Sequence, residues 1–199
     1  MTKATRRLDY LNTLGVQVWF DRSVGPAQFK DVAAINEAGE CNALLSVGSN
    51  NAKIFILSAF PSEEDEQQAQ PFTGDEWQLL MQIIQALGLS RESVYLTNSV
   101  DTPSAGNEQI DKEQLTRCRE YLIEQIRQVS PNVILVLGEV AAQSLLKSTA
   151  CLMELSSNPQ SVNDIEPSIV VCEQLRCLIQ QPLRKKQAWS SLLRLKEQL

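Results

Sequence analysis

The stretch Pro131-Asn-Val-Ile-Leu-Val-Leu-Gly138 decides the fold class of this 199-residue chain. Val133–Leu137 is an unbroken apolar run between turn-forming residues, which is typical of a central parallel strand buried on both faces. Lys53–Ala59 and Ser93–Asn98 are similar runs upstream, and Ser168–Cys172 is a fourth run downstream. Because parallel neighbours need long crossovers, we expect helices between these strands.

The intervening segments have helical patterns. Further elements are expected as helices at Asp75–Leu87, Asp111–Val129, Ala141–Lys147 and Leu183–Leu199 and as a short strand at Ala43–Val47. Strands that alternate with helices favour right-handed crossovers onto both faces of one sheet. The sequence therefore predicts an α/β fold, a three-layer α/β/α sandwich around a mostly parallel sheet of about four or five strands.

The composition is that of a globular domain, with 43% apolar and 21% charged residues. No apolar run approaches the ~20 residues that span a bilayer, so we expect a cytoplasmic protein without membrane contact. The net charge of −6 disfavours broad contact with phosphates. We expect direct nucleic-acid contact to be weak or absent, and Glu63–Gln70 to be a polar, mobile loop.

No metal site or cofactor is expected. The five cysteines are an odd number and form no Cys-x-x-Cys pair, and the chain has no histidine to complete a zinc site. The cysteines are Cys41, Cys118, Cys151, Cys172 and Cys177. Buried thiols are the expected state.

Several motifs appear in a fixed order along the chain: Leu57-Ser-Ala-Phe-Pro-Ser62, Gln70-Pro-Phe-Thr-Gly74, Val94-Tyr-Leu-Thr-Asn98, and the Pro182…Trp189 spacing. This succession resembles the uracil-DNA glycosylase superfamily, most closely its iron–sulfur, family 4-like branch. The resemblance covers residues ~40–199 and implies that superfamily's fold (motif reading,).

The resemblance implies a base pocket at Pro61, Phe72, Asn98 and Gln174. In the family, the aromatic residue at the position of Phe72 stacks on an extruded uracil, and the asparagine at the position of Asn98 reads the edge of the base. Two alternatives stay open from the residues themselves. Phe72 can serve local packing, and Asn98 can terminate its strand and cap the following turn.

The family's catalytic groups are replaced in this chain. Ala59 stands where the family has an acid, and Gln174 stands where it has the histidine that stabilises charge during bond cleavage. Only Cys118 matches a cluster-ligand position, and one thiolate of four cannot hold a [4Fe–4S] cluster. We therefore expect a pocket that is only vestigial, with no catalytic residues, and a pseudo-enzyme that does not excise uracil.

The N-terminal segment predicts a protein partner. Leu11-Asn-Thr-Leu-Gly-Val-Gln-Val-Trp19, after Arg6-Arg7, resembles the start of the psi subunits of bacterial DNA polymerase III. The resemblance implies a docking peptide at residues 1–25 and a glycosylase-like domain at residues 26–199. The residues expected to bind the partner are Leu8, Leu11, Leu14, Val16, Val18, Trp19 and Phe20. In the alternative, this segment folds back onto the chain's own sheet.

We accordingly expect a noncatalytic, psi-like subunit of the DNA polymerase III clamp loader, active in DNA replication. It would link the tau/gamma subunits to chi and, through chi, to single-strand binding protein. One alternative is a divergent uracil-DNA glycosylase superfamily protein that acts in DNA repair or base binding. Another is an unrelated regulatory binding protein on the same scaffold, since a fold does not fix a function.

Overall fold

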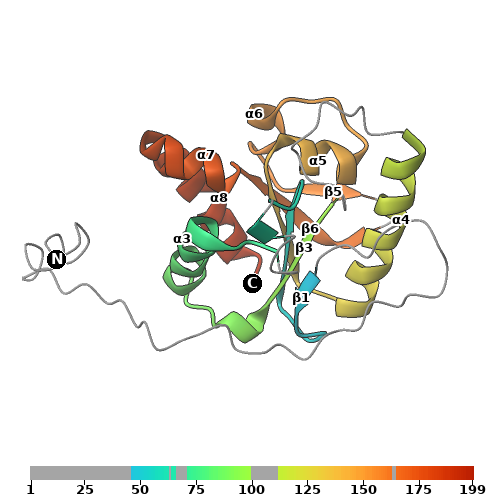
Figure 1. Ribbon diagram of the computed structural model, residues 1–199, viewed down its shortest axis with the longest axis horizontal. Helices are drawn as coiled ribbons and strands as arrows, with labels where there is room; N and C mark the ends of the chain where they lie inside the picture. Colours follow the sequence, from blue (N-terminus) through green and yellow to red (C-terminus); the bar gives the residue numbers. More distant parts are fainter. Residues whose placement is uncertain (1–45, 63, 66–70, 100–111, 163–164) are drawn as a thin grey trace, which may run out of the picture. The chain divides into compact units, whose positions relative to one another are not determined.

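The computed structural model describes residues 46–62, 64–65, 71–99, 112–162 and 165–199. These residues form a sheet with the strand order β1-β3-β2-β4-β6-β5 (Figure 1). The strands are β1 (Ser46–Gly48), β2 (Ile54–Ser58), β3 (Val94–Asn98), β4 (Val133–Leu137), β5 (Gln160–Val162) and β6 (Ile165–Cys172). β3, β2, β4 and β6 are mutually parallel, whereas β1 and β5 pair antiparallel at the two edges.

The predicted α/β class and mostly parallel sheet are therefore confirmed. The expected number of strands was too small, since the described residues contain six. The strand that was not predicted is β5, which has three residues, Gln-Ser-Val, and no apolar alternation that would mark it.

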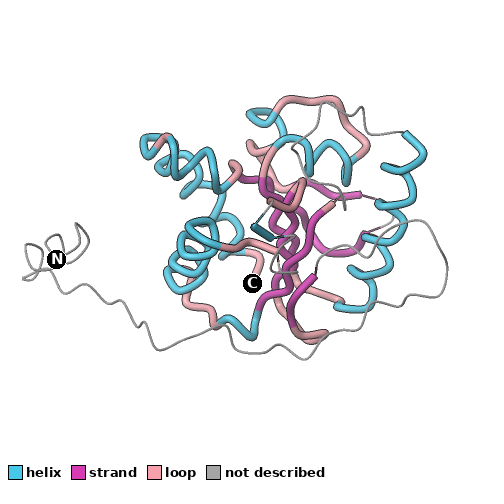
Figure 2. Tube along the Cα trace, in the orientation of Figure 1, coloured by secondary structure: helices cyan, strands magenta, loops and turns pink. Residues whose placement is uncertain are grey.

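Helices cover both faces of the sheet (Figure 2). They are α3 (Gly74–Ala86), α4 (Lys112–Val129), α5 (Glu139–Leu146), α6 (Leu152–Leu155), α7 (Leu175–Gln180) and α8 (Lys185–Glu197), with short 3₁₀ turns η1 (Arg91–Ser93) and η2 (Pro182–Arg184). α3, α7 and α8 lie on one face, and α4, α5 and α6 lie on the other (Figure 1). The chain is thus a three-layer sandwich over the described residues.

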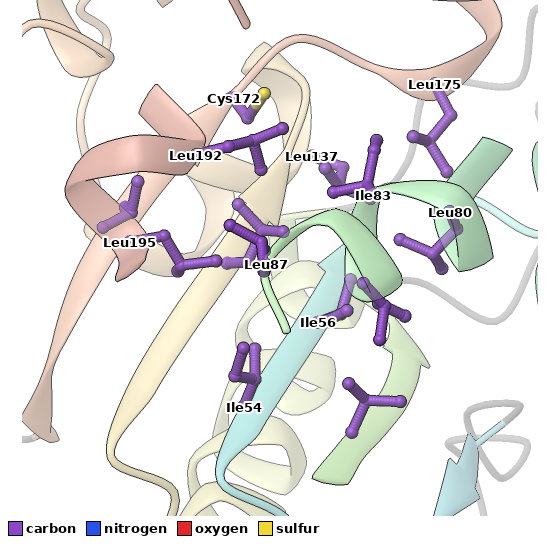
Figure 3. Packing of buried hydrophobic residues seen from close by; sticks show 14 of the residues in the cluster. Ile54, Ile56, Leu80, Ile83, Leu87, Leu137, Cys172, Leu175, Leu192 and Leu195 are labelled. Atoms are coloured by element: carbon purple, nitrogen blue, oxygen red, sulfur yellow. The ribbon is translucent and has the colours of Figure 1, made fainter. Parts of the chain in front are cut away.

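Strand alternation divides the core into two clusters. Phe55 and Leu57 of β2 pack towards α4 and α5, whereas Ile54 and Ile56 pack towards α3 and α8. Figure 3 shows the second cluster, in which Ile56 lies below α3 and Leu195 of α8 closes the same layer. Because β2 is buried on both faces, its sequence is a continuous apolar run, as expected for a central parallel strand.

The connections of β2 and β4 leave the sheet in opposite directions. β2 is followed by α3 and then by its neighbour β3 on one side, whereas β4 is followed by α5, α6 and β5 before its neighbour β6 on the other side. In open parallel sheets, ligands bind outside the carboxyl ends of strands where the strand order reverses in this way. The fold therefore directs attention to the loops after β2 and β4.

Within the described part of the chain, no helix has both the length and the apolar character needed to cross a membrane.

Candidate functional site

One row of residues runs across the carboxyl edge of the parallel sheet. Asn98 of β3 pairs with Ser58 of β2, Ser58 pairs with Leu137 of β4, and Leu137 pairs with Cys172 of β6. Side chains alternate along a strand, and the preceding residues Leu57 and Thr97 face α4. The row therefore faces the layer formed by α3, α7 and α8.

Asn98 is the polar residue of this row that most needs a ligand. Its side chain is 2% exposed, and its Nδ2 has no hydrogen-bond partner among the described residues. A buried amide nitrogen without an acceptor costs free energy, and native proteins rarely leave one unpaired without a functional reason. The alternative in which Asn98 caps the following turn depends on its Oδ1 as an acceptor. Residues 100–111 lie outside the described residues, so that alternative stays a prediction.

The loop after β2 lies beside Asn98. The backbone N–H of Ser99 donates to the carbonyl of Ser58 at 2.8 Å, and the Ser99 hydroxyl donates to the carbonyl of Ala59 at 2.9 Å. These bonds join the ends of β2 and β3, so that Ala59 and the buried Pro61 follow directly from the row. Ala59 is 5% exposed and presents only a methyl group at this place.

Phe72 comes from the segment before α3 and packs in the same layer. Its ring is 4% exposed and belongs to the apolar cluster of α3, α7 and α8. Its backbone has a φ of 59°, in the left-handed region that residues other than glycine adopt rarely. Phe72 therefore packs locally in this apolar cluster, as one alternative expected. Its role in stacking on a base stays a prediction.

Gln174 enters from β6, as the residue before the first turn of α7. It is half-buried and lies against Gly138, where a methyl group in place of the glycine hydrogen would be 3.4 Å from the Gln174 Cβ. The N–H of Gly138 donates to the carbonyl of Cys172 at 2.8 Å, which holds the loops after β4 and β6 together. The uncharged side-chain amide of Gln174 thus belongs to a residue that lies beside the loop after β4.

The floor below this edge is apolar. Leu137 and Cys172 lie near Leu192 of α8, and Leu175 of α7 lies above Leu80 of α3 (Figure 3). Burial raises the pKa of the Cys172 thiol to about 12, so the sulfur is an uncharged, protonated group at neutral pH. The Cys172 side chain therefore adds no charge at this edge.

Asp65 is the residue of this region that the sequence interpretation missed. The expectation of a mobile loop at Glu63–Gln70 is wrong at this position, since Asp65 is 6% exposed and its carboxylate accepts three hydrogen bonds. The signal that could have found it is the spacing Ser62-x-x-Asp65, because a serine followed three residues later by an acid is typical of a capping box.

The structure thus brings Pro61, Asn98 and Gln174 to the carboxyl edge of the sheet, at β2, β3 and β6, and Phe72 to the helical layer on the face of that row. Their functional roles stay predictions. The residues expected to bind a partner, from Leu8 to Phe20, lie outside the described residues, as does the whole segment 1–25.

Comparison with known proteins bears on the family. The model of the uracil DNA glycosylase superfamily matches residues 45–193. The chain is 33% identical over 102 residues to a type-4 uracil-DNA glycosylase of Archaeoglobus fulgidus, covering 51% of each chain. It is 32% identical over 114 residues to the type-4 enzyme of Saccharolobus solfataricus, covering 57% of this chain and 53% of that one. The chain spans about half the length of the curated relatives it matches.

These matches correct two expectations. The expected psi-like clamp-loader subunit is wrong, because the relatives are named as glycosylases and the short N-terminal motif behind that expectation lies before the matched region. The expectation of a protein that is not an enzyme is contradicted as well, since the named relatives are enzymes. The matches favour the alternative of a divergent uracil-DNA glycosylase superfamily protein. From its strand order, its motifs and the match over residues 45–193, the chain belongs to the uracil DNA glycosylase superfamily.

Proposed function

We propose that this protein acts in DNA repair as a glycosylase that takes an extruded nucleobase, with uracil as the reference substrate, at the carboxyl edge of its sheet. The single observation that supports the proposal most is the buried Nδ2 of Asn98, which has no acceptor among the described residues. A base carbonyl would supply that acceptor.

The edge of uracil fits a carboxamide. It presents a carbonyl oxygen, which accepts from an amide N–H₂, beside a ring N–H, which donates to an amide oxygen. Enzymes that act on a base turn it out of the stack and read this edge by hydrogen bonds. In support of this role, Asn98 ends β3 beside β2, next to the strand-order reversal, and its side chain faces the layer that contains Phe72.

Stacking is the second contact proposed. Aromatic side chains that receive an extruded base contribute area and geometry that hydrogen bonds alone do not supply. Phe72 is the aromatic residue of the α3 layer at the entrance to that helix. We infer that a bound base lies against this ring with its edge towards Asn98.

Bond cleavage then depends on neutral groups. As the C1′–N bond breaks, its electron pair moves onto the base and the sugar becomes electron-poor, after which water adds at C1′ and loses a proton to solvent. Gln174 can donate an amide hydrogen bond to the charge on the departing base, whereas Ala59 cannot accept a proton from the water. A neutral donor is roughly half as strong as a charged one, so we expect slow excision.

DNA contact is expected to be weak and sensitive to salt. The charge of −6 opposes phosphate binding. Near the site, Arg176 is exposed and pairs with Glu76, and Arg184 pairs with Glu173 at 2.7 Å. Lys185 and Lys186 at the start of α8 are exposed cations.

The test is single-turnover release of uracil from a labelled single-stranded oligonucleotide with protein in excess. Three proteins are compared: the natural chain, Asn98→Ala, and Asn132→Ala as a matched control. Asn132 is an exposed asparagine that precedes β4, at the opposite end of the sheet. We expect slow release by the natural chain and the control, and a loss on the order of a hundredfold in Asn98→Ala. Absence of release by the natural chain, or equal rates in all three proteins, would overturn the proposal.

A further inference from the structure

The carboxylate of Asp65 joins the two ends of the segment between β2 and α3. Its Oδ2 accepts from the backbone N–H of Ser62 at 2.9 Å, and its Oδ1 accepts from both the N–H and the hydroxyl of Thr73, each at 2.7 Å. In return, the N–H of Asp65 donates to the Ser62 hydroxyl at 3.1 Å. Ser62 and Asp65 thus form a reciprocal capping box, and the second carboxylate oxygen is directed at Thr73.

The Thr73 hydroxyl bonds to Asp65 and does not cap α3. Thr73 is the residue before the first turn of α3, where a threonine hydroxyl normally accepts from the helix backbone. No such capping bond forms in α3, and the hydroxyl donates to Asp65. Its side chain therefore ties residue 73 to residue 65.

The two hydrogen bonds between Asp65 and Thr73 bear on the backbone conformation of Phe72. Phe72 precedes Thr73 and has its backbone in the left-handed region, at a φ of 59°. Such a conformation persists in a bulky residue only when neighbouring contacts fix it. Two short bonds to the next residue, one through its backbone N–H, are contacts of this kind.

We propose that Asp65 is a positioning residue, which fixes the backbone of Phe72 and so sets where the aromatic ring lies. What the ring does there rests on the proposed function. Asp65 itself does not touch a base in this account. Its carboxylate acts through Thr73, and its burial keeps the two bonds to Thr73 away from competing water.

The test compares Asp65→Asn with Glu64→Gln, which removes the same charge from the exposed neighbouring residue. The first readout is hydrogen exchange of the Thr73 amide, measured by NMR, which needs no substrate. Exchange should be at least about tenfold faster in Asp65→Asn and unchanged in Glu64→Gln. Equal protection in Asp65→Asn and the natural chain would overturn the proposal.

The second readout is a double-mutant cycle on uracil release. Asp65→Asn should slow release roughly ten- to a hundredfold, the scale that a misplacement of about 1 Å produces at an active site. In a Phe72→Ala background it should have no further effect, because Asp65 acts through Phe72. Full additivity of the two substitutions would mean a general structural role and would overturn the proposal.

Two outcomes are kept distinct. If the natural chain releases no uracil, the proposed function fails, and the exchange of the Thr73 amide alone decides whether Asp65 holds the backbone. If Asp65→Asn does not fold, Thr73→Val replaces it, because that variant removes only the hydroxyl bond. It should slow release several-fold, and release at the natural rate by Thr73→Val would then overturn the proposal.

Discussion

The Nε of Arg176 donates to Oε1 of Glu76 at 3.2 Å, which joins α7 to the first turn of α3. The pair connects the helix that follows Gln174 with the helix that follows Phe72. Burial raises the pKa of Glu76 above its ordinary value of 4.5, and the hydrogen bond and charge of Arg176 do not fully offset that effect. The pair between α7 and α3 therefore contains a carboxylate that ionises less readily in the folded chain than in the unfolded chain.

The first prediction concerns the stability of this pair at different pH values. Because the folded state binds the Glu76 proton more tightly than the unfolded state, its contribution to the free energy of unfolding is present below pH 4.5. That contribution is lost as the pH rises through the raised pKa. Glu76→Gln should thus gain stability relative to the natural chain from pH 4 to pH 7, as measured by urea unfolding.

Asp75→Asn is the control for this prediction, since Asp75 is an exposed acid in the same first turn of α3. It should show no such gain with rising pH. A Glu76→Gln variant that loses stability relative to the natural chain as the pH rises would show that the ion pair outweighs the cost of burial.

A second prediction concerns Gly138. Its φ of 96° and ψ of 162° lie in a region that is essentially restricted to glycine, and a Cβ there would contact the Gln174 Cβ at 3.4 Å. Gly138→Ala should lower the free energy of unfolding by about 1–3 kcal/mol and also slow uracil release. Thermal or urea unfolding and single-turnover assays on the same sample measure both effects.

Gly88→Ala serves as the comparison for Gly138. Gly88 also has a positive φ, of 81°, but a Cβ there meets no atom of the described residues within 4 Å. Gly88→Ala should lower the free energy of unfolding, whereas the folded variant should release uracil at nearly the natural rate. Equal loss of release in both variants would indicate that the contact between Gly138 and Gln174 is irrelevant to the site.

A third prediction concerns Gln174, where a histidine would add a positive charge to the site. Gln174→His should speed uracil release about tenfold or more at pH 6, because an imidazolium donates a charge-assisted hydrogen bond to the departing base. The gain should disappear as the pH rises past the histidine pKa of about 6.5, whereas the natural chain should show no such step. Single-turnover rates from pH 5.5 to 8 test this, and a rate that is unchanged at every pH would remove Gln174 from the mechanism.

A fourth prediction concerns thiol reactivity. Burial raises the pKa of Cys172 to about 12, so almost no thiolate exists at pH 8. A maleimide should label the exposed Cys151 quickly in the folded chain and should label Cys172 only after unfolding. Peptide mapping by mass spectrometry distinguishes the two sites, and rapid labelling of Cys172 in the native state would contradict the apolar floor described for the site.

The sequence predicts the centre of this fold better than its edges. Val133–Leu137 is the same in prediction and structure, because a strand buried on both faces must be apolar throughout. β6 begins at Ile165, three residues before the predicted start at Ser168. The sequence favours the later start, because a proline such as Pro167 is disfavoured inside a strand. β6 pairs with β4 only over Ser168–Cys172, so the missing backbone N–H of Pro167 breaks no hydrogen bond of that pairing.

The site was predicted in part, for a physical reason. The family resemblance implied one pocket for Asn98 and Gln174, and the structure puts both residues at the same edge of the sheet, at the ends of β3 and β6. Asp65 was placed in a polar, mobile loop, although its spacing from Ser62 is typical of a capping box. Its bonds to Thr73, eight positions away, follow no local pattern. The expected partner came from a short motif outside the matched region, and the relatives correct it.

The most direct measurement of the central claim is the NMR spectrum of the Asn98 side-chain amide with DNA bound. The protein is labelled with ¹⁵N-asparagine, and Asn98→Ala assigns the signal. The ligand is an oligonucleotide with 2′-fluoro-2′-deoxyuridine, whose glycosidic bond resists cleavage, and the control is the same strand with an abasic analogue. The Asn98 Nδ2 protons should move downfield with the base present and stay in place with the abasic strand, since only the base offers a carbonyl acceptor. An unmoved Asn98 signal, while other signals report bound DNA, would contradict the account.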